Sequence, residues 1–201
     1  MMNGPEMSYA EYLAYESESG LSEWVKGAII VYNPPTILHQ QLVVFLVTLL
    51  KNFVRLHQLG RVLTAPVTMR AMPNGNAREP DVLFLATEHV DRLTETELNG
   101  PADLVIEVIS TESMARDRVD KFYEYQEGGV REYWMLDPRP SKERVDFYVL
   151  DEHGRYQPVP VPTDGIYHST VLPRFALQIT WLWQDDPNPL QPLAAPVSPR
   201  A

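Results

Sequence analysis

The chain has 201 residues, 17 basic and 27 acidic side chains, a formal net charge of −10 and no cysteine. Its length suits one domain with a sizeable core. The lack of cysteine excludes a disulfide framework and a thiolate zinc site. The acidic balance counts against a constitutive DNA coat protein, because nonspecific affinity for phosphates depends on Lys and Arg. It does not exclude a nuclease whose carboxylates hold a metal ion.

Strand-like and helix-like segments alternate along the chain. Short apolar or alternating runs bounded by Gly and Pro predict strands, and apolar residues three or four positions apart predict helices. We expect helices over residues 8–17, 36–59 and 113–127, and strands over residues 23–32, 61–65, 67–70, 80–85, 103–109, 130–137, 144–150 and 155–161, with one or two more in 166–182. Residues 86–101 are expected to form a loop with one helical turn.

This order of elements predicts an α/β fold. We expect a mixed, curved central sheet flanked by helices, preceded by an N-terminal helix and a β-hairpin. One domain is expected over residues 1–183. A mobile tail rich in Pro and Ala is expected over residues 184–201, which have little apolar surface to bury.

Local signals mark the first three elements. Ser8 and Glu11 have the spacing of a capping box, which predicts the start of the first helix. The hairpin turn is expected near Lys26-Gly27, and Thr36 is expected to cap the long helix.

The long helix is apolar on almost every side over residues 42–50. Such a helix is buried on more than one side. Either the sheet covers one side and a partner subunit another, which predicts a homodimer, or the domain encloses the helix. The apolar run is shorter than the roughly 20 residues of a membrane span, and Lys51, Asn52 and Arg55 follow it. We expect no membrane association, no signal peptide and a cytoplasmic location.

Two acidic residues lie on strands that are otherwise apolar. Asp81 lies at the start of strand 80–85, and Glu107 lies within strand 103–109. Buried acids are costly unless a cation, a hydrogen bond or another charge compensates them. If these strands pair, the two carboxylates come close and repel each other unless a proton or a metal lies between them. The pair therefore predicts a site for Mg²⁺, with Mn²⁺ as the alternative, because Mg²⁺ prefers carboxylate, water and phosphate oxygens.

A lysine on the next helix completes the pattern. Lys121 would orient a water or stabilise the charge of a phosphorane-like transition state. Each of the three residues also has a structural alternative: Asp81 as a strand-start acid that caps a turn after Pro80, Glu107 as a sheet-edge acid paired with an arginine, and Lys121 as a solvated lysine beside Asp117 or Tyr125.

Two further polar residues receive lesser roles. We expect His39 to cap or hydrogen-bond near the start of the long helix rather than to bind metal. We expect Glu79 to point to the opposite strand face from Asp81, so it ranks below Asp81 as a site residue.

The order of these motifs resembles the PD-(D/E)XK nuclease superfamily, and within it the bacterial Uma-two family of restriction-endonuclease-like proteins. The resemblance covers roughly residues 8–182. Its carriers are Tyr12-Leu13, Glu23 with Gly27, Pro34 with His39, Arg78-Glu79-Pro80-Asp81-Val82, residues 103–110, residues 117–121 with Tyr125, and residues 129–138. The last run is very specific, whereas the Pro-Asp pair alone is weak.

The resemblance implies roles for individual residues. Asp81 and Glu107 match the acidic metal ligands, and the carbonyl of Val108 would be a further ligand. Glu23 matches an acid that often helps to hold metal or water. The usual lysine two positions after the second acid is replaced by Ile109, so Lys121 is the candidate for its role.

Two functions follow. The first is a metal-dependent endonuclease that hydrolyses nucleic acid, with DNA favoured, through a metal-activated water. The alternative is a catalytically inactive interaction module, dimeric and built on a nuclease fold, since fold does not imply function.

Overall fold

The computed structural model describes residues 2–15, 21–31, 34–110, 114 and 116–190. The helices are α1 (Tyr9–Leu13), α2 (Ile37–Leu56), α3 (Phe122–Gly128), the 3-10 helices η1 (Thr87–Arg92) and η3 (Ile179–Trp183), and the π-helix η2 (Arg116–Lys121). The strands are β1 (Met2–Glu6), β2 (Ser22–Val25), β3 (Ala28–Val31), β4 (Gly60–Thr64), β5 (Thr68–Arg70), β6 (Val82–Ala86), β7 (Glu97–Asn99), β8 (Leu104–Val108), β9 (Glu132–Asp137), β10 (Arg144–Leu150), β11 (Tyr156–Val159), β12 (Ile166–His168) and β13 (Ala176–Gln178).

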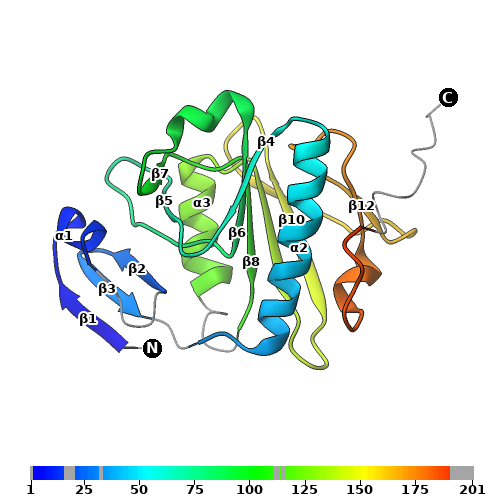
Figure 1. Ribbon diagram of the computed structural model, residues 1–201, viewed down its shortest axis with the longest axis horizontal. Coiled ribbons are helices and arrows are strands. Elements are labelled where there is room, and N and C mark those ends of the chain that lie inside the picture. The colour runs from blue at the N-terminus through cyan, green and yellow to red at the C-terminus, as the bar shows by residue number, and fades with distance from the viewer. Residues whose placement is uncertain (1, 16–20, 32–33, 111–113, 115, 191–201) are drawn as a thin grey trace.

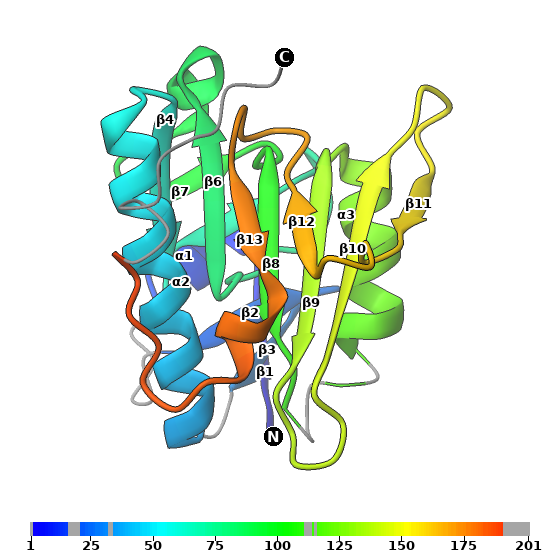
Figure 2. The same cartoon turned by 90° about the vertical axis from the view of Figure 1, so that its right-hand side faces the viewer.

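The centre of the fold is a six-stranded mixed sheet in the order β11-β10-β9-β8-β6-β4. Strands β8 and β9 are parallel, and the other neighbouring pairs are antiparallel. Helix α2 and the β12–β13 pair cover one face of this sheet, and α3 covers the other (Figure 2). Helix α1 and the small sheet β1-β3-β2 lie to one side (Figure 1). The predicted α/β fold, with a mixed sheet flanked by helices, is confirmed.

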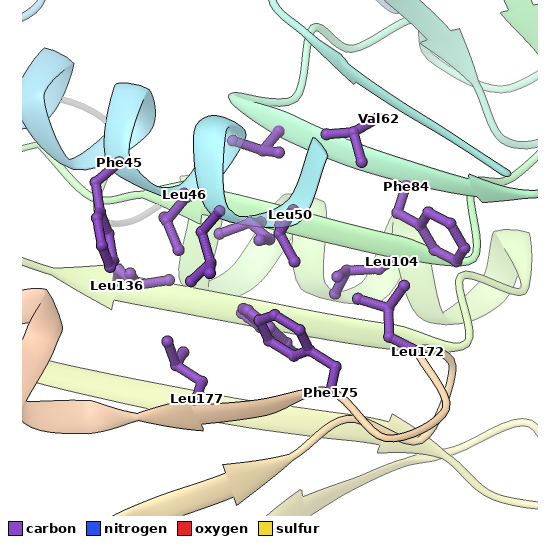
Figure 3. Close-up of a cluster of buried hydrophobic side chains, with 14 of the residues drawn as sticks. Phe45, Leu46, Leu50, Val62, Phe84, Leu104, Leu136, Leu172, Phe175 and Leu177 are labelled. Carbon is purple, nitrogen blue, oxygen red and sulfur yellow. The ribbon is translucent and has the colours of Figure 1, made fainter. Parts of the chain in front are cut away.

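Apolar side chains that point alternately to opposite faces of the sheet form two separate hydrophobic clusters. On β8, Leu104 and Ile106 face the cluster under α2, while Val105 faces the cluster under α3. On β6, Phe84 and Leu83 divide in the same way. Figure 3 shows the larger cluster, in which side chains from α2 meet those of the sheet and of the segment that includes β13. Because successive strand residues point to opposite faces, this pattern is the one that the sequence predicts.

The N-terminal signals form as expected. Ser8 Oγ accepts a hydrogen bond from the Glu11 N–H at 3.3 Å, and the Glu11 carboxylate accepts one from the Ser8 N–H at 2.7 Å, which completes the capping box. Lys26 and Gly27 form the hairpin turn with φ values of 51° and 89°. A type I′ two-residue turn requires positive φ at both positions, and glycine adopts it without a steric cost.

Helix α2 is only partly enclosed. Thr36 Oγ1 accepts the His39 N–H at 3.2 Å and caps the helix as predicted. The inward face packs into the larger core, but Val44 and Leu56 are 61% and 65% exposed. Full enclosure by the domain is therefore wrong, and a partner subunit on this face stays a prediction. Among the described residues, α2 is the one helix long and apolar enough for a membrane span, although its inward face forms much of the core.

Several boundaries differ from expectation. The strand expected over 80–85 begins at Val82, so Asp81 precedes it. The segment 67–70 leaves the main sheet, because β5 pairs with β7, a strand that was not expected within 86–101. Residues 116–121 form a π-helix before α3, instead of one regular helix over 113–127. Such π-segments are frequent at functional sites.

Some expected segments fall partly outside the described residues. These are residues 16–17 of the first helix, residue 32 of the hairpin, residues 113 and 115 of the third helix, and residues 191–201 of the tail.

A buried carboxylate ties the C-terminal segment to the sheet. Glu132, on β9, is fully buried. Its oxygens accept hydrogen bonds from Trp134 Nε1 at 2.7 Å and Tyr167 Oη at 2.8 Å, and from the backbone N–H groups of Thr170 at 2.8 Å and Val171 at 3.1 Å. Burial of this charge is tolerated because its lone pairs are satisfied.

We predict that Glu132→Gln destabilises the protein by about 2–4 kcal/mol. The amide turns an NH₂ group toward hydrogen-bond donors and leaves buried N–H and O–H groups unsatisfied. Urea denaturation measures the change, and the exposed Glu143→Gln is the matched control. Equal stability of the two variants would contradict this role.

Candidate functional site

The two strand acids meet at one end of the central sheet. Strands β6 and β8 pair as predicted, and their register, with Val82 opposite Ile106, continues to place Asp81 opposite Glu107. Asp81 Oδ2 accepts the backbone N–H of Val108 at 2.7 Å. Asp81 therefore ties the start of β6 to the end of β8, which is a contact between strands and not a cap on a local turn.

A cavity of about 310 Å³ lies at this end of the sheet. It is lined by β2, the start of α2, the end of β4, the segment just before β6, the end of β8, and η2. The lining residues with ionisable side chains are Glu23, His39, Glu79, Asp81, Glu107, Arg116, Asp117 and Lys121. The structure thus brings all four predicted side chains, Asp81, Glu107, Lys121 and Glu23, to one cavity.

Lys121 lies at the centre of a buried ionic cluster. Its Nζ is 2.9 Å from Glu107 Oε1, 3.0 Å from Glu23 Oε1 and 3.3 Å from Asp117 Oδ1. Lys121 is only 4% exposed, so the alternative of a solvated lysine is wrong, although Asp117 is its i,i+4 partner. Three carboxylates around one ammonium hold the sheet, the N-terminal hairpin and η2 together.

Glu107 lies on a central strand, because β8 is flanked by β6 and β9. The alternative of a sheet-edge acid paired with an arginine is therefore wrong. Tyr125 Oη donates to Glu107 Oε1 at 2.7 Å, beside the Lys121 contact. Burial raises the pKa of Glu107 to about 8, against the opposing effect of the Lys121 ammonium.

Arg78 is a site residue that sequence reasoning missed. Its Nη1 donates to Glu23 Oε2 at 2.8 Å, and its Nε and Nη2 donate to both oxygens of Glu124 on α3 at 2.8 and 2.7 Å. Arg78 is 2% exposed. The arginine fixes Glu23 between two cations, Arg78 and Lys121. Its place in the run Arg78-Glu79-Pro80-Asp81 was the only available signal.

His39 combines an expected role with an unexpected one. Its backbone N–H takes part in the cap of α2, but its ring Nε2 lies 3.3 Å from Asp81 Oδ2. Burial opposes protonation of the imidazole, but hydrogen bonding to Asp81 and its charge outweigh burial, so the pKa of His39 is raised. The Val108 carbonyl also contributes a hydrogen bond to this shift.

Glu79 shares the cavity with Asp81, so the expectation of opposite faces is wrong. Side chains two positions apart along an extended chain share a face. The Glu79 carboxylate accepts the Ser22 N–H at 3.1 Å and the Tyr12 hydroxyl at 3.2 Å. Burial raises the pKa of Glu79 to about 7.

The donor set fits a hard divalent cation. The carboxylates of Asp81 and Glu107 and the carbonyl of Val108 are oxygen donors that line one cavity. Within the described ranges, no group of three or more His, Asp or Glu side chains is arranged to hold a metal ion by itself. An ion here would therefore keep water ligands, which suits Mg²⁺, because it retains several waters and uses one or two carboxylates.

Comparisons with known proteins identify the family and the fold. Residues 9–180 match the Uma2 family, described as "Putative restriction endonuclease". Among solved structures, the crystal structure of "a putative nuclease belonging to DUF820" from Anabaena variabilis ATCC 29413 is similar, with a TM-score of 0.69 and 17% sequence identity. The match covers 87% of this chain and 96% of that one, and at this identity it shows the fold. A comparison with curated proteins finds no match.

We predict that Lys121→Met destabilises the protein by about 3–5 kcal/mol, because it leaves three buried carboxylates without their shared cation. Adding Glu107→Gln to this variant should restore part of the loss, since one of the three charges is removed. Chemical denaturation measures both changes, with the exposed Lys142→Met as the matched control. If Lys121→Met unfolds like the control, the cluster does not depend on this lysine.

Proposed function

Because this chain belongs to the Uma2 family, we propose that it is a divalent-metal-dependent endonuclease that hydrolyses phosphodiester bonds, with DNA as the favoured substrate. The observation that carries this proposal is the placement of Asp81 opposite Glu107 in one cavity, with the Lys121 ammonium 2.9 Å from Glu107. Carboxylates that hold a cation, beside a fixed positive charge, suit the hydrolysis of a phosphodiester.

The carboxylates of Asp81 and Glu107 and the carbonyl of Val108 would hold Mg²⁺, with Mn²⁺ as the alternative. When bound, such an ion polarises a phosphate oxygen and lowers the pKa of a coordinated water. The backbone of Val108 orients the Asp81 carboxylate through the 2.7 Å hydrogen bond. Tyr125 and Lys121 both bond to Glu107 Oε1, which fixes the orientation of this carboxylate.

Lys121 would stabilise the charge on the phosphate or orient the water. Its ammonium has three N–H donors, and it already contacts three carboxylates. The longest of these contacts is to Asp117, at 3.3 Å, so a phosphate oxygen would replace Asp117 at the least cost. Glu23 supports the site by holding Lys121, and Arg78 holds Glu23 in turn.

The lining of the cavity also bears on the proposed substrate. Arg116 lines the cavity, as does Lys121, which adds a second cation for the phosphate backbone of a nucleic acid.

The protein would act as a homodimer through the outer side of α2, where Ile37, Val44 and Leu56 are exposed. Sedimentation tests the dimer independently of the chemistry.

We predict that Asp81→Asn and Glu107→Gln each reduce cleavage of DNA in the presence of Mg²⁺ or Mn²⁺ by about 100-fold or more. Each change removes a carboxylate charge while preserving shape, so the metal-free protein should melt at the same temperature as the parent or higher. The exposed Asp91→Asn is the matched control and should cut normally. Unchanged cleavage by both site variants would exclude the assignment.

A second function, a metal-free interaction module, is favoured by a specific observation. Lys121 already compensates the buried carboxylates, and among the described residues no three side chains form a metal cluster. Calorimetric titration separates the two functions. For the nuclease, we expect saturable binding of Mn²⁺ or Mg²⁺ that Asp81→Asn weakens by about tenfold or more. Titrations without heat, alike for parent and variant, would favour the module.

A further inference from the structure

We propose that a second cavity, next to that of the candidate site, binds an unpaired guanine base of the substrate strand through the Glu79 carboxylate. This inference rests on the proposed nuclease function and deepens it, because it names the base beside which the chain would cut. The starting observation is that Glu79 lines both cavities.

The second cavity has a volume of about 320 Å³. It lies on the side of the molecule where α1 and the small sheet are found (Figure 1). Helix α1 and the start of β2 line it, together with Pro66, Thr68 on β5, and Thr96 just before β7. Pockets that bind small molecules begin at about 300 Å³, so this cavity is large enough for one planar ring system.

The two cavities share a wall. On β2, Ser22 lines the second cavity and the next residue, Glu23, lines the first. Ala65 lines the first cavity and Pro66 lines the second, and Glu79 lines both. A strand with a phosphate at the candidate site would therefore place a neighbouring base close to the second cavity.

The Glu79 carboxylate has acceptor capacity that the protein does not fill. Its Oε2 accepts the Ser22 N–H at 3.1 Å. Its Oε1 lies 3.2 Å from the Tyr12 hydroxyl, but that hydroxyl has one proton and lies closer to the Ser22 carbonyl, at 2.9 Å. An ionised carboxylate accepts about four hydrogen bonds, so each oxygen of Glu79 has room for a further donor.

No cation of the protein fills this capacity. In the part of the chain that the structure describes, no Lys, Arg or His forms an ion pair with Glu79. This distinguishes Glu79 from Glu23 and Glu107, which both contact Lys121. A largely buried carboxylate is costly unless donors compensate it, and a ligand with N–H groups would supply them.

Guanine matches this pair of acceptors. Its N1–H and N2–H₂ groups lie side by side on the Watson–Crick edge and can donate to the two oxygens of one carboxylate. Adenine and cytosine present one amino group beside a ring-nitrogen acceptor, and thymine presents one N–H between two carbonyls, so each would turn a lone pair toward a carboxylate oxygen. The Watson–Crick edge is accessible only in an unpaired base.

Aromatic and apolar surface lies at the same cavity. Tyr15 and Leu13 line it and are 39% and 37% exposed. Bases stack on aromatic rings with little regard to their identity. Tyr15 would therefore add affinity for any base, while Glu79 would add the selectivity for guanine.

Digestion of a single-stranded DNA library of random sequence, with Mg²⁺ or Mn²⁺, tests the preference. We expect guanine at one fixed position relative to the cut, favoured about tenfold or more over the other bases. Glu79→Gln should lose this preference and favour adenine or cytosine, because an amide presents one acceptor and one donor. The exposed Glu88→Gln, on η1, is the matched control and should keep the guanine preference.

Thr96→Trp is a second variant that leaves the carboxylate unchanged. Thr96 is exposed and lines the second cavity, so an indole at this position would occupy the space of the base. This variant should also lose the guanine preference. A guanine preference that survives in both Glu79→Gln and Thr96→Trp would overturn the guanine site and leave the proposed nuclease intact.

Binding without cleavage separates the two proposals. Fluorescence anisotropy in EDTA compares a labelled thymidine hexamer with hexamers in which guanine replaces one thymine at each position in turn. At one position or more, guanine should bind the parent about tenfold tighter and Glu79→Gln no tighter. Cleavage with no base preference and equal binding of all hexamers would overturn the guanine site alone. Guanine-dependent binding without any cleavage would overturn the nuclease alone, and the absence of both would overturn both proposals.

Discussion

The ionic cluster around Lys121 is the interaction on which the candidate site depends. One ammonium from η2 contacts carboxylates from β8, from the N-terminal hairpin and from its own helix, all of them nearly inaccessible to solvent. A buried ion pair is a weak source of net stability, but breaking it by removal of one partner is costly. The cluster therefore acts mainly as a constraint. It specifies where the small sheet and η2 lie relative to the central strand that carries Glu107.

The central sheet supplies the other half of the site. Burial on both faces makes β8 apolar except at Glu107, and its antiparallel register with β6 brings Asp81 to the same end. Asp81 directly precedes β6 and Glu107 is the second-last residue of β8, so both line the cavity at this end of the sheet. Much of the rest of the sheet lies between two apolar clusters, with the hydrogen-bonded Glu132 among the buried acids outside the cavity.

The sequence was informative where one short segment determines the outcome. Alternation predicted the faces of β8, the capping box predicted α1, and Lys26-Gly27 predicted the hairpin turn, because each depends on local geometry. Apolar neighbours also made Glu107 conspicuous. Arg78 and the ring of His39 gave no comparable signal, since their contacts join segments about 40 or more residues apart in sequence. The predicted direction of the Glu79 side chain was wrong, because residues two positions apart along an extended chain share a face, as Glu79 and Asp81 do.

The charge balance of the site links these features to its chemistry. Three acids, Glu107, Glu23 and Asp117, contact the buried Lys121, and the buried Arg78 is shared by Glu23 and Glu124. Burial raises the pKa of Glu107, and the Lys121 ammonium opposes this effect. In the proposed function, a divalent cation would add positive charge beside Asp81 and Glu107, which line the same cavity. The chain has a net charge of −10. In the proposed function, the acids of this site favour binding of a cation, and that cation can bridge to an anionic phosphate.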